Sequence, residues 1–590
     1  MSGVWDAAGP EPRVADRLRA RLCLRETRGG DAPAFGSAPE PVMIGHPARG
    51  RHLLEGKLRF AGHFAEIPEG LPPWGFDLPD PMAAELHRFA WLDDLAALGG
   101  RAAWAAARLW TLDWTRRFGR GGGAGWTAAR TGRRLLALID HAALIEAGPH
   151  ARGFDAAFRR SLGAQARFLA RRWRAAPSGP ARVEALTGLL RAALALPGTG
   201  LPVDAAAAAL AREADAAVSG DGAIPSRNPE RLMELHVRLA WAARALEAGG
   251  HPVPTALTDA LGRAAPVLRS LRHADGRLVR MHGAGGGTEG RLDAALAQGG
   301  SGHPAERMAM GFARLSEGRV TVIADAAPPP AGLAGRNAHA STLAIEVTAG
   351  REALVVSCGS GAPFGPEWRR VGRATAAHSV LGLDGVSSAR LREPVERRGR
   401  TLELLDRAPE EVARAIGTRR GGAEGDPGAL VLDMSHDGWR ESHGLIYRRQ
   451  IALSRDGREV AGEEVLAAET DRDARLLTLA MEDAADEGIG FAVRFHLHPD
   501  TEVAADPGGA AATVALPSGA LWELRHDGVG RLAVEPSVHF DSSRLRPVAA
   551  QQIVLSGRVE EAATHLRWSL ARAGRSRART RDLEWPGEGV

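Results

Sequence analysis

The sequence predicts an α+β multidomain protein in which an array of helices precedes a set of antiparallel β-sheets. Two observations lead to this fold class. Between residues 82 and 265, apolar residues recur at the i, i+3, i+4 and i+7 spacing of amphipathic helices. From residue 311 to 570 the spacing changes to two, and short apolar runs alternate with Gly, Asp and Pro turns. Many strands without helices between them are typical of stacked antiparallel sheets.

Short breaks divide the helical part. Gly-Gly, Gly-Pro and Pro positions interrupt the pattern, for example at Gly99-Gly100 and Gly249-Gly250. About ten helices joined by short loops form either an open α-solenoid or a closed α/α toroid, and periodicity does not choose between them. The predicted helices cover residues 82–98, 102–117, 128–147, 156–176, 181–196, 203–218 and 230–248.

Three segments lie outside this array. Residues 1–50 are rich in Pro, Gly and Arg and predict a flexible tail with one amphipathic helix near residues 14–25. Residues 51–79 mix short strand-like pieces with Pro turns and predict an extended arm. Residues 273–304 are rich in Gly and form either a hinge between the halves or a loop over the cleft. This segment lacks the GK[ST] ending of a nucleotide-binding loop.

The second half predicts many short strands separated by turns. The predicted strands cover residues 320–324, 343–347, 353–356, 379–383, 430–434, 446–453, 459–466, 491–497, 512–516, 521–524, 531–536, 552–555 and 564–570. Residues 571–590 are rich in Arg and then acidic, which predicts a frayed C-terminal tail.

Composition and charge argue against several classes of protein. The chain has 590 residues, and 75 Lys and Arg nearly balance 71 Asp and Glu, so nucleic-acid binding is not expected. Its two cysteines are far apart and predict no disulfide framework. No apolar run reaches the ~18 residues of a membrane span. The N-terminus has no apolar core of a signal peptide, so the sequence itself predicts a cytoplasmic protein.

Several motifs follow one another in a specific order. H-A-S-T-L-A-I-E-V begins at His339, V-V-S-C-G-S follows it, and R-A-T-A-A-H-S-V-L-G-L-D-G-V-S-S ends at Ser388. Downstream come S-H-D-G-W, G-L-I-Y-R-R-Q-I-A-L-S and F-H-L-H-P, and upstream lie L-L-E-G-K-L-R-F-A-G, L-H-R-F-A-W-L-D-D-L and S-R-N-P. Over roughly residues 50–570, this series resembles the heparinase II/III family.

The resemblance implies a fold and an activity. The fold is an N-terminal incomplete (α/α) toroid followed by a C-terminal antiparallel β-sandwich. It divides the chain into a tail (1–50), a toroid (51–310), a β-sheet domain (311–570) and a second tail (571–590). The activity is that of a polysaccharide lyase, which cleaves an acidic, uronate-containing glycan by β-elimination. The family setting is the periplasm or cell envelope, in contrast to the cytoplasmic placement that the N-terminus predicts.

β-Elimination needs a group that neutralises the uronate carboxylate, a base for the C5 proton and an acid for the leaving oxygen. Asn, Arg and His suit the first task, and His and Tyr suit the proton steps. His339 resembles the catalytic histidine that opens a family motif, and His378, in T-A-A-H-S, matches a second motif. Each is alternatively a structural histidine at the start of a strand.

Asn228 and Arg227, in S-R-N-P, would by resemblance neutralise the carboxylate at the mouth of the toroid. Asn228 before Pro229 equally fits the N-cap of a helix. Arg373 and Arg369 would grip substrate anions, or else belong to a solvated basic loop. His443 is a further polar candidate for substrate binding.

Tyrosine marks a departure from the family pattern. The lyases that the chain resembles use a tyrosine from the helical domain, and this chain has none before Tyr447. Either a histidine performs both proton steps, or the substrate differs, or the protein is a non-catalytic glycan-binding or exopolysaccharide-assembly protein on the same fold. No cofactor is expected. His496 and His498 share one strand face and offer a zinc site as the metal alternative, without a supporting carboxylate.

Overall fold

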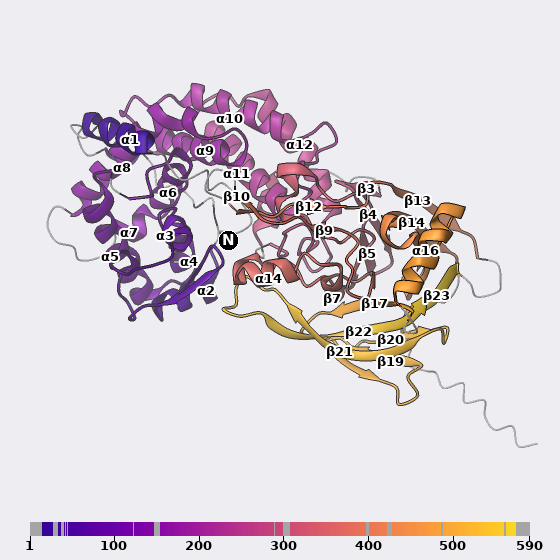
Figure 1. The fold of residues 1–590 in the computed structure, drawn as a ribbon. Helices are drawn as coiled ribbons and strands as arrows, with labels where there is room; N and C mark the ends of the chain where they lie inside the picture. Colours follow the sequence, from indigo (N-terminus) through magenta and orange to yellow (C-terminus); the bar gives the residue numbers. More distant parts are fainter. Residues whose placement is uncertain are drawn as a thin grey trace, which may run out of the picture.

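Helices and sheets occupy opposite sides of the molecule (Figure 1). The computed structural model describes residues 14–573, apart from 28–32, 37–40, 42, 44, 122, 147–153, 288–289, 299–306, 397–400, 422–426, 485–487 and 560–561. The expectations for residues 1–13 and for the C-terminal tail beyond residue 573 lie outside the described residues.

The helices of the first half curve into an incomplete α/α toroid, as predicted (Figure 1). Within it α6 packs on α9, α9 on α10, and α12 on both α10 and α11. These helices are α3 (Asp80–Leu86), α4 (Ala90–Leu98), α5 (Gly100–Phe118), α6 (Ala128–Asp140), α7 (Ala142–Glu146), α8 (Phe154–Arg172), α9 (Pro180–Ala195), α10 (Val203–Ala217), α11 (Pro229–Ala248) and α12 (Thr255–Ser270).

Local sequence sets where these helices begin and end. α11 starts at Pro229, whose ring fixes a helical φ, and stops before Gly249. The single helix expected over residues 82–98 is instead two helices, α3 and α4. Phe89 between them has a φ of 62°, a left-handed conformation that a right-handed helix cannot include.

α6 and α9 approach each other through glycines. A Cβ built on Gly188 would lie 2.1 Å from the Gly132 carbonyl oxygen, and one on Gly132 would lie 2.4 Å from the Glu184 carbonyl oxygen. Because no side-chain carbon tolerates these distances, both positions require glycine. The backbones of α6 and α9 are therefore in direct contact.

The arm and the remaining helices frame this ring. The arm contains α2 (Pro47–Leu54) and the hairpin of β1 (Lys57–Phe60) and β2 (His63–Glu66). The N-terminal helix α1 (Val14–Thr27) packs on α8. Four further helices lie later in the chain: α13 (Arg291–Gln298), α14 (Pro366–Val371), α15 (Arg440–His443) and α16 (Asp471–Asp483). Among the described residues, no helix combines the length and apolarity needed to cross a bilayer.

The second half contains two large antiparallel sheets, as predicted. One has eight strands in the order β13-β14-β15-β16-β23-β20-β19-β18. The other has nine: eight in the order β21-β22-β17-β7-β6-β5-β4-β3, and β8, which pairs with β17. The strands are β3 (Met308–Ala309), β4 (Phe312–Glu317), β5 (Val320–Asp325), β6 (Ile345–Ala349), β7 (Glu352–Val356), β8 (Leu381–Leu383), β13 (Val412–Arg419), β14 (Ala429–Trp439), β15 (Leu445–Ser454), β16 (Glu459–Ala467), β17 (Ile489–Leu497), β18 (Glu502–Ala505), β19 (Ala511–Ala515), β20 (Leu521–His526), β21 (Arg531–His539), β22 (Val548–Val559) and β23 (Ala563–Arg572).

Side chains join the two sheets into one core. Phe495 on β17 meets Trp568 on β23 edge to face, with ring centroids 4.8 Å apart. Arg449 on β15 donates to the carbonyl oxygens of Leu343 and Ser379 across the same interface. Tyr447 is fully buried on β15, and its hydroxyl donates to Glu464 at 2.5 Å. The chain's one tyrosine is thus part of the core of the sheets.

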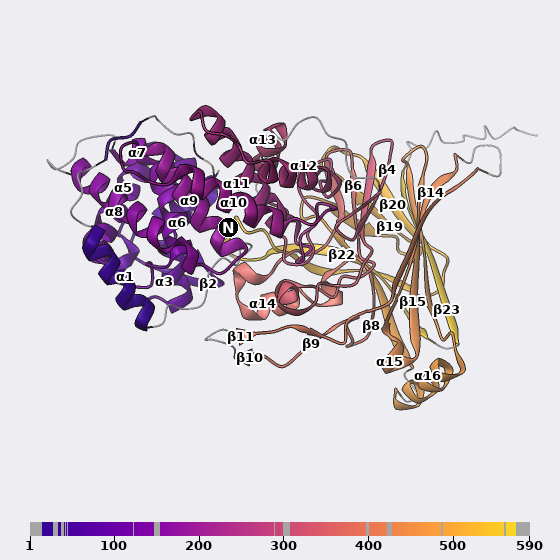
Figure 2. The ribbon, with the colours of Figure 1, turned by 90° about the horizontal axis from the view of Figure 1, so that it is seen from above.

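Small strand pairs reach from the sheets towards the helical half (Figure 2). They are β9 (Arg390–Leu391) with β12 (Leu405–Asp406), and β10 (Val395–Glu396) with β11 (Thr401–Leu402). The sequence pattern had indicated strands without intervening helices, whereas α16 interrupts them. Its signal was the N-cap, since Thr470 accepts a hydrogen bond from the Asp473 amide.

Candidate functional site

Three histidines from both halves of the chain meet between the helical domain and the sheets. His339 and His378 precede strands β6 and β8, and His282 comes from the Gly-rich segment after α12. The rings of His339 and His378 lie 5.1 Å apart, and those of His282 and His339 lie 6.1 Å apart. All three are at most 2 % exposed. The two histidines predicted from the motifs therefore lie together, but solvent does not reach them.

One peptide bond stands between Asn228 and His339. Asn228 Nδ2 donates to the His282 carbonyl oxygen at 2.9 Å, and the Gly283 amide donates to His339 Nε2 at 2.9 Å. This peptide group offers a carbonyl oxygen to the proposed carboxylate neutraliser and an N–H to the proposed base. Because Nε2 accepts this hydrogen bond, its lone pair is not available to take a proton from a substrate.

The segment that supplies this peptide has an unusual backbone. His282 has a φ of 53° and Gly283 a φ of 89°, both in the left-handed region. A Cβ on Gly283 would lie 2.8 Å from the Asn337 Cβ and 3.1 Å from Asn228 Nδ2. Glycine at 283 is therefore what lets the chain fit between the two halves.

Asn228 performs the capping role that was one of its two predicted alternatives. It is fully buried, and its Oδ1 accepts the Arg231 amide at 3.0 Å at the start of α11. Together with the bond to His282, both ends of the side-chain amide are engaged.

Arg227 fastens the helical half to the sheets. Its guanidinium donates to the carbonyl oxygens of four residues of the β half and forms an ion pair with Asp325, the last residue of β5. The carbonyls belong to Met310, Gly311, Ala327 and Pro328. A guanidinium has five N–H donors, so this contact set occupies the fork. The predicted role in substrate binding would require these contacts to break.

Asp325 is the charged centre under the histidines. Burial raises the pKa of its carboxyl, but Arg227, His282 and Ser341 outweigh burial and hold that pKa well below its usual range. His282 Nε2 lies 3.1 Å from one carboxylate oxygen, and Ser341 Oγ donates to the same oxygen at 2.7 Å. His282 Nδ1 accepts the His339 amide at 3.2 Å, so the ring is positioned from both sides.

Burial keeps the histidines neutral. It lowers the pKa of His339 well below 6.5, and His378, His282 and Arg373 lower it further. Burial, then His496 and His282, lowers the pKa of His378 to about 3. His339 Nδ1 is buried without a hydrogen-bond partner among the described residues. These rings are thus unprotonated at neutral pH, as a general base would be.

The pH dependence of the free energy of unfolding tests the burial of His378. The pKa of His378 is lower in the folded chain than its ordinary value, so the unfolded chain binds the proton first as the pH falls. Wild-type stability should therefore fall between about pH 6.5 and pH 3, and His378→Phe should remove about 1.4 kcal/mol per pH unit from that slope. Urea unfolding at successive pH values measures it. The exposed His565→Phe is the control, and equal slopes in both variants would refute the assignment.

The arginines after β7 are tied to the chain around them, and two of them lie on the helix α14 rather than in the basic loop that was one alternative. Arg369 donates to Glu403 and to the Arg336 carbonyl oxygen, and Arg370 pairs with the same Glu403. Arg373 is buried and donates to the carbonyl oxygens of Ala338 and Glu403. Arg373 therefore lies next to the chain that carries His339, and Arg369 holds α14 to Glu403 and to the backbone of Arg336.

The other predicted polar residues lie elsewhere. His443 is on α15, at the far end of the sheets from α11 (Figure 2), and its Nδ1 contacts Ser442 Oγ at 2.8 Å. His496 faces Cys358, Ser537 and the Ala376 carbonyl oxygen, whereas His498 stacks edge to face on His539. The described residues hold no cluster of three or more His, Cys, Asp or Glu with metal-binding geometry.

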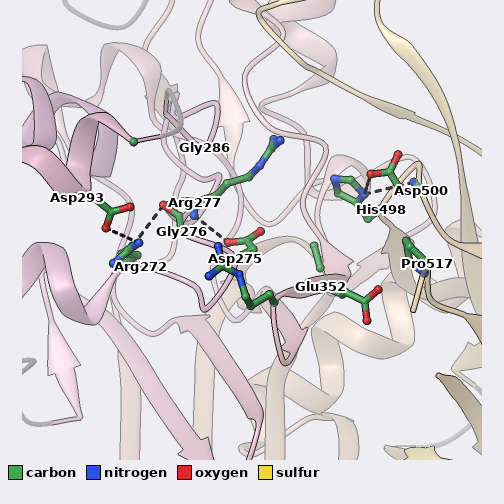
Figure 3. A pocket seen from close by; sticks show the side chains of 13 residues that line it. Arg272, Asp275, Gly276, Arg277, Gly286, Asp293, Glu352, His498, Asp500 and Pro517 are labelled. Carbon is green, nitrogen blue, oxygen red and sulfur yellow. Dashed lines mark hydrogen bonds and ion pairs between the residues drawn. The ribbon is translucent and has the colours of Figure 1, made fainter. Parts of the chain in front are cut away.

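A polar cavity of about 340 Å³ borders the Gly-rich segment (Figure 3). Its walls come from residues between 272 and 293, from the start of β7 with the residue before it, and from the loops after β17 and β19. Figure 3 shows Arg272 paired with Asp293, and His498 beside Asp500. None of the three clustered histidines lines it.

Sequence reasoning missed His282 and Asp325. His282 stood in a glycine-rich segment that indicated a hinge or a loop, and Asp325 directly followed the strand predicted over residues 320–324. One signal could have pointed to His282. The helical half has no tyrosine, and a histidine that follows its helices lies beside His339 instead.

The chain resembles several known proteins. Residues 301–569 match the family model described as heparinase II/III-like, C-terminal. FtsZ-localized protein C of Caulobacter vibrioides is 33 % identical over 584 residues, which cover 96 % of this chain and 93 % of that protein.

Two solved structures share the fold. Heparinase III superposes with a TM-score of 0.62 at 12 % identity, covering 95 % of this chain and 90 % of that one. A mutant of the heparan sulfate lyase HepC from Pedobacter heparinus superposes with a TM-score of 0.51 at 14 % identity, covering 95 % and 88 %. At these sequence identities, the superpositions show a shared fold alone.

Proposed function

This chain belongs to the heparinase II/III-like family, and we propose that it is a non-catalytic member that keeps the glycan-binding fold and localises with FtsZ. The relative named for localisation with FtsZ aligns along nearly the whole chain, which supports the second part. The cytoplasmic placement expected from the N-terminus is part of the same proposal. A fluorescent fusion imaged beside labelled FtsZ tests it, and a uniform or envelope-wide distribution would contradict it.

The observation that carries the non-catalytic role is the peptide bond between residues 282 and 283. It takes the Asn228 amide and the His339 lone pair, which a lyase would need for the carboxylate and for the C5 proton. Arg227 is likewise committed to carbonyl oxygens and to Asp325. With Asn228, His339 and His378 all buried, a sugar ring has no route to these groups in this conformation.

Ultraviolet absorbance tests this role directly. Elimination creates a conjugated C=C bond that absorbs, whereas hydrolysis does not. We expect no rise when the protein is incubated with a panel of polyuronates and glycosaminoglycans, while retention on the same immobilised glycans persists. A rise that disappears in His339→Ala would contradict the proposal and identify the base.

A second candidate function is elimination after the 282–283 segment withdraws. Its support is the convergence of His339, His378 and Asn228, together with Arg373, at one place. In that case Asn228 and Arg227 would neutralise the carboxylate of an acidic polysaccharide, and His339 would move the proton with help from His378 and Arg373.

One variant separates the two candidates. In Gly283→Ala the new Cβ collides with Asn337 and crowds Asn228, which pushes the segment away from His339. If the non-catalytic proposal holds, this variant loses stability and gains no absorbance change on any glycan. If the segment masks a working site, the same variant eliminates faster than wild type, and the added substitution His339→Ala abolishes that gain.

A further inference from the structure

A second cavity, of about 290 Å³, lies beside Arg370 and Arg373, and none of the three clustered histidines lines it. Its walls are the end of α14 and the residues after it, the turn after β8, and the paired strands β9 and β12. Three of its lining residues are arginines and none is acidic: Arg370, Arg373, Ala374, Gly385, Val386, Ser387, Ala389, Arg390, Leu391 and Leu405.

Arg373 lines this cavity and is almost entirely buried. The residue is 3 % exposed, and its Nε and Nη1 donate to the carbonyl oxygens of Ala338 and Glu403. Its Nη2 is buried and has no hydrogen-bond partner among the described residues. A buried cation with an unused N–H is costly unless an acceptor meets it, and a carboxylate oxygen is the strongest such acceptor.

Arg390 stands at the rim as a second cation. It is exposed, and within the described part of the chain its guanidinium makes no ion pair or hydrogen bond. Two carboxylates lie nearby and both are paired. Glu403 is shared by Arg369 and Arg370, and Asp406, opposite Arg390 on β12, pairs with Arg392. The cavity therefore offers positive charge from two directions, and no acidic residue in its own wall competes for it.

The rest of the wall is aliphatic. Val386, Leu391 and Leu405 line it, and no aromatic ring does. Sugar rings usually dock on flat aromatic faces and hydroxyl partners, whereas branched alkyl groups pack on aliphatic side chains. The lining thus favours a compact ligand that combines an aliphatic body with one anionic group.

The cavity of Figure 3 differs in the charge of its wall. It holds Arg272, Arg277 and Arg351 against four carboxylates, those of Asp275, Asp293, Glu352 and Asp500. A mixed wall of that kind does not select an anion. Of these two cavities, the arginine-lined one has the excess of cations in its wall.

We propose that the cavity between Arg373 and Arg390 binds an aliphatic carboxylate, either a free small acid or the carboxylate of a peptide. The carboxylate lies between Arg373 Nη2 and the Arg390 guanidinium, and the alkyl group packs on Val386, Leu391 and Leu405. None of the three clustered histidines lines this cavity, so its ligand can bind while the histidine cluster stays closed.

Calorimetric titration with N-acetyl-L-leucinate tests the proposal on the full chain. We expect saturable binding that is at least tenfold tighter than binding of N-acetyl-L-leucinamide, which lacks the charge, and of acetate, which lacks the alkyl group. Equal affinity for the amide, or an equal or higher affinity for glucuronate, would overturn it. Absence of binding to N-acetyl-L-leucinate would overturn it as well.

Matched variants locate the site. Arg390→Gln should weaken binding several-fold, whereas Arg392→Gln, an exposed arginine two residues away that does not line the cavity, should not. Arg373→Lys keeps the buried charge but removes the fork, and it should weaken binding at least tenfold while circular dichroism stays unchanged. If Arg390→Gln binds as wild type does, the ligand lies elsewhere and the proposal fails. Polyuronate elimination, measured in parallel, reports on the family chemistry independently.

Discussion

Replacing Arg227 with methionine is expected to lower the free energy of unfolding by about 3–5 kcal/mol, because it strands a buried carboxylate. Asp325 is fully buried, and Arg227 is its partner from the helical half. The same substitution leaves four carbonyl oxygens of the β half without their donor. Since Arg227 joins the two halves, we also expect their unfolding transitions to separate. Guanidinium unfolding followed by tryptophan fluorescence measures both effects.

The pH dependence of the stability lost in Arg227→Met tests whether the loss comes from the stranded Asp325 carboxylate. The pKa of the Asp325 carboxyl is lower in the folded chain than in the unfolded chain, so the stabilisation is present above about pH 4 and disappears as the pH falls through the folded value. The deficit of Arg227→Met should therefore be full at pH 7 and shrink in acid. Arg448→Met, which breaks the surface pair with Glu469, is the control and should cost at most about 1 kcal/mol. Equal losses in the two variants would contradict the role of Arg227.

Gly188→Ala is expected to cost about 2–4 kcal/mol, although alanine favours helices over glycine. The new Cβ would lie 2.1 Å from the Gly132 carbonyl oxygen, and that atom belongs to the backbone of α6, which cannot rotate away. The two helices must separate, and the packing between them loosens. The midpoint of thermal unfolding, followed by circular dichroism in the helical band, reports the loss.

Gly262→Ala is the matched control. Gly262 lies inside α12, is exposed, and has no atom within 4 Å of an added Cβ. At this position only the helix propensity of alanine over glycine acts, and the substitution should stabilise the protein by about 0.5–1 kcal/mol. Opposite signs at the two glycines are the expected result. Two stabilising or two neutral substitutions would show that α6 and α9 are not in backbone contact.

The fold was predictable because it depends on periodic patterns. Apolar spacing identified the helices of the toroid and most strands, and glycine and proline marked the breaks. The errors arose where tertiary structure overrides local pattern. Phe89 breaks a continuous helical pattern by adopting a left-handed φ, and α16, which begins after the Thr470 N-cap, lies between strands β16 and β17. The choice between solenoid and toroid needed contacts between distant helices.

The site was predictable only in part, because motifs identify residues but not what faces them. His339 and His378 came from the order of the motifs, and they do lie together. Asn228 fitted both a helix cap and a carboxylate neutraliser, and the cap contact is present. The peptide at residues 282–283 could not be foreseen, since a glycine run carries no signal of the partner 56 positions away that it meets.

Hydrogen exchange at the Gly283 amide tests the central claim, that the chain closes its own histidine site. This amide donates to a buried imidazole between the two halves, so the halves must separate before it can exchange. We predict strong protection, with peptides spanning residues 281–287 exchanging at least about a thousandfold more slowly than an unstructured chain at pH 7. Full exchange within seconds would contradict the account. It would mean that the segment leaves His339 readily and that the site is open to a substrate.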